Sequence, residues 1–88
     1  MTEQETITKP RTIRLQPLEE LVGPFLGYCY DDPDLFVDVG CYRASFFFDS
    51  TIADNIICKL RSVPLGRRIA ILRTQNLSDP VLVRLMPT

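Results

Sequence analysis

Apolar and polar residues alternate along most of the chain, with the period of two that is typical of strands with one buried face. Prolines, glycines and aspartates interrupt the alternation and mark the turns. Between the first two predicted strands, Pro17 favours one short helical turn that runs to Leu21. The pattern predicts a short edge strand over residues 12–15 and further strands over residues 22–31, 35–39, 41–48, 68–74 and 81–86.

One segment between these strands changes to helical spacing, with apolar residues at intervals of three and four. Asp49 or Ser50 can cap its first turn, and Pro64 and Gly66 end it. We therefore expect one helix of roughly three turns after the strand over residues 41–48. The apolar positions that it buries are Ile52, Ala53, Ile56, Ile57 and Leu60.

The turns predict that the strands beside them pair antiparallel. The Asp31–Asp34 segment contains Pro33 and connects one hairpin, and Gly40 connects the next. In the strand after Gly40, the alternation turns Phe46 toward the core and Phe47 toward the opposite face.

Three main strands, a helix and two further strands follow one another in the order of the five-stranded OB barrel, in which a helix plugs one end. We therefore predict a mainly β fold, a small OB-like antiparallel barrel of five strands with one helix between the third and fourth. The same pattern permits an α+β alternative, an open antiparallel sheet made of two hairpins with one packed helix.

The composition fits one globular domain, because 88 residues that are 45% hydrophobic and 24% charged exclude the disordered and membrane-spanning classes. We expect residues 1–10 to form a flexible leader and residues 11–88 a single compact domain, soluble and located in the cytoplasm. The three cysteines, Cys29, Cys41 and Cys58, are expected to be reduced and buried as small hydrophobic residues.

Few residues here suit catalysis. The chain has no histidine, and its four glycines are isolated, so phosphate loops and dinucleotide fingerprints are excluded. The Asp31–Asp34 segment is the only dense group of carboxylates and is interpreted as a turn, with a cation site as the alternative. We therefore predict a protein that is not an enzyme and has no catalytic residues, no metal site and no cofactor.

Aromatic and arginine residues suggest a binding surface for single-stranded DNA or RNA. In an OB-like fold, bases stack on aromatic rings while arginines hold the phosphates, and Phe36, Arg43 and Phe47 share the predicted outer face of two strands. The Asp31–Asp34 carboxylates would repel phosphate, so the predicted binding is modest and sensitive to salt. The predicted nucleic-acid-binding residues are Phe36, Arg43, Phe47, Arg67, Arg68 and Arg73.

A protein-interaction module, or a small subunit of a homo-oligomer or hetero-oligomer, is the alternative function. The sequence pI of about 5.2 and the apolar strands favour this interpretation. Leu82 and Met86 lie on the predicted less-buried side of the last strand, where a partner protein or a second copy could cover them.

Overall fold

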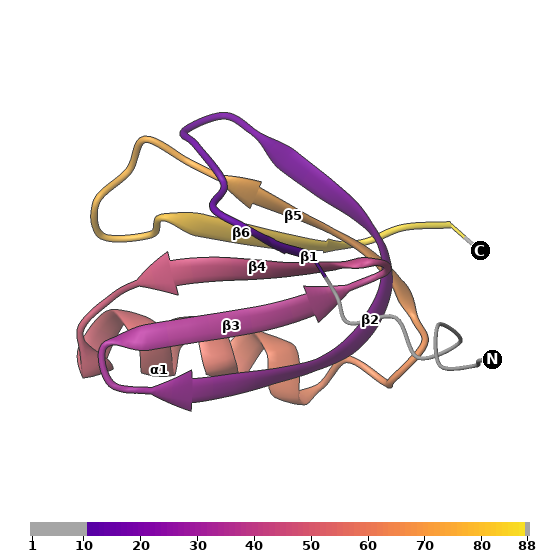
Figure 1. Ribbon diagram of the computed structural model, residues 1–88, viewed down its shortest axis with the longest axis horizontal. Helices are drawn as coiled ribbons and strands as arrows, with labels where there is room; N and C mark the ends of the chain where they lie inside the picture. The colour runs from indigo at the N-terminus through magenta and orange to yellow at the C-terminus, as the bar shows by residue number, and fades with distance from the viewer. Residues whose placement is uncertain (1–10, 88) are drawn as a thin grey trace, which may run out of the picture.

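A computed structural model describes residues 11–87 as six strands and one helix (Figure 1). The predicted flexible leader, residues 1–10, lies outside the described residues. Within the described part of the chain, no helix is long and apolar enough to cross a membrane. The elements are β1 (Arg11–Ile13), β2 (Glu20–Asp31), β3 (Asp34–Val39), β4 (Tyr42–Phe47), α1 (Ser50–Arg61), β5 (Arg68–Arg73) and β6 (Val81–Leu85).

The strands form one open sheet in the order β1-β4-β3-β2-β5-β6, so the predicted closed barrel is wrong and the alternative of an open sheet is nearer. A barrel closes only when its first and last strands pair. Here β1 occupies the outer edge of β4, in a parallel pair held by the Arg11 N–H, which donates to the Cys41 carbonyl at 3.0 Å. β6 therefore remains at the opposite edge, and the sheet is mixed instead of purely antiparallel.

β2 is the longest strand and belongs to both halves of the sheet, since its first half pairs with β5 and its second half with β3. In Figure 1 it sweeps around the right-hand side of the molecule and curves the sheet around the core. The register shifts between Phe25 and Gly27, where Gly27 has a φ of 128°. This bulge turns Phe25 and Tyr28 to the same face, so the uninterrupted alternation predicted for this strand is wrong.

The core lies inside the curve of the sheet and is closed by α1, which contacts β2 and β6. The helix begins as predicted, because the Asp49 side chain accepts a hydrogen bond from the Ile52 N–H at 3.0 Å. The helix buries the predicted apolar face through Ala53, Ile56, Ile57 and Leu60.

The helical turn predicted after Pro17 is wrong, since Glu20 and Leu21 already belong to β2.

The hairpin between β2 and β3 turns at Asp32 and Pro33 alone, because Asp31 and Asp34 pair with each other inside the strands. The Tyr30 hydroxyl fixes this end, because it donates to Asp32 Oδ1 at 2.8 Å and lies 3.2 Å from the Phe48 carbonyl. Burial of the ring, the hydrogen bond to Asp32 and the surrounding carboxylates raise the pKa of Tyr30 to about 12. The hairpin is therefore tight and offers no loop that could close over a ligand.

All three cysteines are exposed free thiols, so the prediction that they are buried is wrong. Their positions explain the difference. Cys29 lies on the outer face opposite Phe36, Cys41 follows the turn at Gly40, and Cys58 lies on the solvent side of α1. The preference of cysteine for the interior is a property of the residue type, and each local position overrides it here.

Candidate binding surface

The outer face of β3 and β4 carries the first three predicted site residues. Cross-strand pairs place Phe36 opposite Ser45, Asp38 opposite Arg43 and Asp34 opposite Phe47, all directed away from the core. Phe47 is 67% exposed, while its neighbour Phe46 is 1% exposed. The predicted orientation of the Phe46 and Phe47 side chains is therefore confirmed, and the Phe47 ring is accessible to a ligand.

Arg43 already has partners within the protein, Asp38 and Phe36. Its Nε donates to Asp38 Oδ1 at 2.8 Å and its second guanidinium nitrogen to Oδ2 at 3.1 Å, a bidentate pair that raises the pKa of Arg43. The guanidinium also lies over the Phe36 ring, 5.7 Å from its centre. Arg43 thus covers part of Phe36, and its charge is balanced by Asp38.

Acidic residues border this face on the β2 side. Asp34 is the direct neighbour of Phe47 on β3, and Asp31 is in turn the neighbour of Asp34 on β2. Within the part of the chain that the structure describes, neither carboxylate has an ion-pair partner, and no group of acidic or cysteine side chains could hold a metal ion. A phosphate would therefore be repelled from this side of Phe47.

On its other side, Phe47 borders a surface hollow of about 200 Å³. The connection between β1 and β2 forms one wall, the end of β4 another, and the last residue of β5 the third. Two of the lining residues are arginines, and no carboxylate of residues 11–87 lies within ion-pair distance of either. The lining residues are Arg14, Leu15, Gln16, Pro17, Ser45, Phe46, Phe47 and Arg73.

Arg73 is held in place by its surroundings. Its guanidinium lies over the Phe48 ring, 5.5 Å from the centre, and one terminal nitrogen donates to the Leu15 carbonyl at 3.3 Å. Its Nε is buried, out of reach of solvent, and has no hydrogen-bond partner among the described residues. Arg73 therefore lines the hollow with a cation whose position is fixed.

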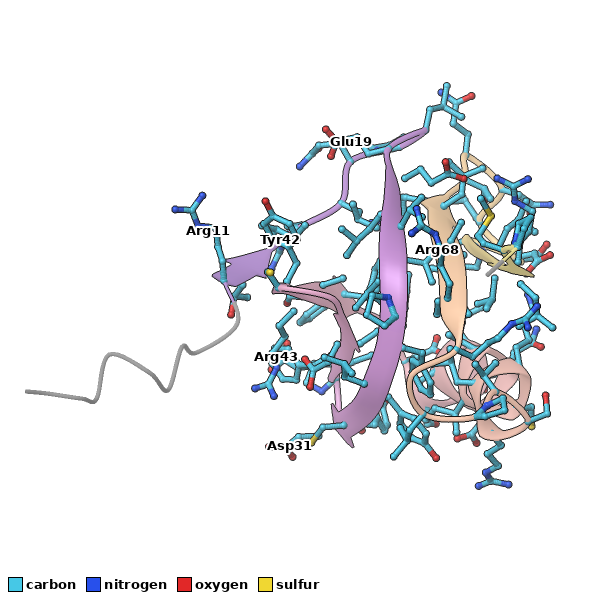
Figure 2. The ribbon with its side chains drawn as sticks, turned by 90° about the vertical axis from the view of Figure 1, so that its right-hand side faces the viewer. Arg11, Glu19, Asp31, Tyr42, Arg43 and Arg68 are labelled. Atoms are coloured by element: carbon cyan, nitrogen blue, oxygen red, sulfur yellow. The ribbon has the colours of Figure 1, made fainter. Side chains whose placement is uncertain are left out.

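The structure separates the six predicted residues into three places. Phe36 and Arg43 lie on the outer face of β3 and β4, and Phe47 and Arg73 meet at the hollow. Arg67 and Arg68 lie at the start of β5, roughly 16 Å along the strand from Arg73. Figure 2 shows Arg43 and Arg68 on opposite sides of β2. One ligand-sized site cannot include all six residues.

Arg14 is the residue that sequence reasoning missed. It follows the last residue of β1, and the parallel register of β1 with β4 brings it beside Ser45. The alternation of Ile13, Arg14 and Leu15 indicates which face Arg14 occupies. Only the pairing of β1 with β4 shows what lies next to it, and no local pattern specifies that pairing.

The sequence matches no protein-family model, and comparison with curated proteins and with solved structures finds no significant similarity.

Proposed function

We propose that this protein is a non-catalytic binding module for single-stranded nucleic acid. The observation that carries the proposal is the position of the exposed Phe47 ring beside a hollow whose two arginines have no ion-pair partner among residues 11–87. Stacking on an aromatic ring and pairing of arginine with phosphate are the two contacts by which such modules hold a strand. We also propose that the protein is located in the cytoplasm.

The charges on the two sides of Phe47 would orient a bound strand of nucleic acid. Asp34 lies on one side, and Arg14 and Arg73 lie on the other. We infer that one base stacks on Phe47, a neighbouring base reaches the Phe36 side, and the phosphates follow the Arg14 side. Because Arg43 is paired with Asp38, it contributes to the shape of the Phe36 surface more than to phosphate binding.

Fluorescence anisotropy with labelled single-stranded oligonucleotides at low salt tests this function. We expect weak binding that weakens further with salt, within the range of about 1 to 100 micromolar that is usual for non-specific contacts. Replacing Phe47 with alanine removes one stacking platform, worth about 1 to 3 kcal/mol, and should weaken binding by about 5-fold to 150-fold.

Leu77→Ala is the matched control, because Leu77 is 90% exposed, lies on the loop between β5 and β6 and does not line the hollow. This variant should bind as the wild type does. Absence of binding by the wild-type protein at about 100 micromolar, or equal binding by Phe47→Ala, contradicts the proposal.

A second candidate function, self-association, is favoured by the outer face of β2, β5 and β6. Five of the eight paired residues of this face are apolar, the charged ones being Glu20, Arg68 and Arg84, and no element of residues 11–87 packs on it. It also holds both signs of charge in the Glu20–Arg84 ion pair at 2.6 Å, so a second copy related by a two-fold axis would find complementary groups. Its accessible apolar side chains are Val22, Pro24, Leu72 and Leu82, whereas Ala70 on the same face is buried.

Sedimentation velocity from 10 to about 200 micromolar distinguishes this second candidate. Dimers that form in the wild type should be lost in Leu82→Glu, because the new carboxylate would be buried without a partner. They should persist in Leu77→Glu, which adds the same charge on the exposed loop. A wild-type protein that stays monomeric over the whole range rules out self-association through this face at these concentrations.

A further inference from the structure

We propose that the hollow beside Phe47 binds the terminal phosphate of the nucleic acid strand, a phosphate monoester. This inference rests on the proposed function and names the part of the ligand that the hollow holds. A hollow of about 200 Å³ has the volume of roughly six water molecules, which is enough for a phosphate group and the carbon next to it. It is smaller than the pockets of about 300 Å³ or more that enclose whole organic ligands. The phosphate is therefore placed in the hollow, and the base is placed on the exposed Phe47 ring.

Charge then selects the kind of phosphate. Arg14 and Arg73 bring two positive charges to the hollow, and no carboxylate of the described residues balances them. A phosphate monoester carries about −1.5 to −2 at pH 7, whereas each diester of a strand carries a single charge. The monoester therefore matches the pair of arginines more closely than an internal phosphate does.

The polar groups around the hollow suit a phosphate rather than an apolar ligand. Arg73 is fixed by Phe48 and the Leu15 carbonyl, so it loses little side-chain freedom when an anion binds. The Ser45 hydroxyl in the lining has no hydrogen bond to the described residues, so it can donate to a phosphate oxygen beside the Arg73 guanidinium. The site is thus largely formed before the ligand arrives.

The test measures the affinity of one oligothymidylate six nucleotides long, labelled at its 3′ end, with and without a 5′-phosphate. We expect the 5′-phosphate to tighten binding to the wild-type protein about tenfold, as charge-assisted hydrogen bonds do. The ratio of the two affinities should fall toward one as the pH drops below about 6, where the phosphate gains a proton.

Three variants assign the effect to the hollow. Arg14→Gln should bring the ratio to about one, while Phe47→Ala should weaken the binding of both oligonucleotides and keep the ratio. Arg61→Gln is the matched control on the exposed side of α1 and should change neither affinity. The same oligonucleotide labelled at its 5′ end, with and without a 3′-phosphate, gives the corresponding ratio of affinities for the other end of the strand.

The outcomes separate this inference from the proposed function. If both oligonucleotides bind and neither terminal phosphate changes the affinity, the inference is overturned and the proposed function stands. If no oligonucleotide binds, the proposed function falls, and NMR titration with inorganic phosphate then decides the site. Saturable shifts at Gln16 and Ser45 that Arg14→Gln abolishes support a phosphate site, and their absence overturns it. An equal gain for a phosphoserine peptide over its serine form would overturn the assignment to a nucleic acid end.

Discussion

Truncation of Phe46 to alanine is expected to cost about 3 to 5 kcal/mol of unfolding free energy, the usual loss for a buried phenylalanine. Phe46 is 1% exposed, and its ring stacks on Phe48 with 5.7 Å between the centres. The substitution removes this contact and leaves a cavity in the core beside the hollow that Phe46 lines. Small domains have only about 5 to 15 kcal/mol of stability, so the variant should be largely destabilised.

Urea denaturation followed by circular dichroism measures this loss, and Phe47→Ala provides the comparison one residue away. Phe47 is 67% exposed, so its truncation should change the unfolding free energy by no more than about 0.5 kcal/mol. The two variants remove the same atoms from the same strand. Equal stabilities would mean that the faces of β4 are not as described.

Replacing Ile56 with alanine should cost about 2 to 4 kcal/mol, because Ile56 is 1% exposed where α1 meets the core. Alanine is the better helix former, so the intrinsic preference of the helix opposes this effect and the measured cost is a lower limit for the lost packing. Thermal and urea unfolding of the variant provide the measurement.

Asn55→Ala isolates the helix preference from the packing, because Asn55 lies next to Ile56 and is exposed. This variant should be unchanged or more stable by about half a kcal/mol. A loss of stability in Asn55→Ala as large as that in Ile56→Ala would mean that the cost at Ile56 cannot be assigned to the packing of its side chain.

Local patterns were sufficient to predict most elements of this fold. The helix, its cap at Asp49 and its buried face follow from a change of period, which depends only on neighbouring residues. The two hairpins follow from Pro33 and Gly40, and the burial of Phe46 follows from alternation. Each of these features is decided within a few residues of the chain.

The features that could not be predicted depend on distant partners or on one unusual backbone position. The bulge at Gly27 inserts a residue into the alternation, and a glycine in the sequence does not reveal its φ. The parallel pairing of β1 with β4 joins segments about thirty residues apart. This pairing places β1 at the edge of the open sheet and brings Arg14 beside Ser45 at the hollow. The pairing of Arg43 with Asp38 is likewise a cross-strand contact, so the charge available on this face could not be read from composition.

The sharing of β2 between the two halves of the sheet has a consequence for how the molecule unfolds. Detachment of one half is expected to disturb the other, because the backbone hydrogen bonds of β3 and of β5 both end on the same strand. Partial opening would have to break β2 at its bulge and expose the side chains packed on either side. The domain should therefore melt in one cooperative step, with the same midpoint whether the probe is placed beside β3 or beside β6.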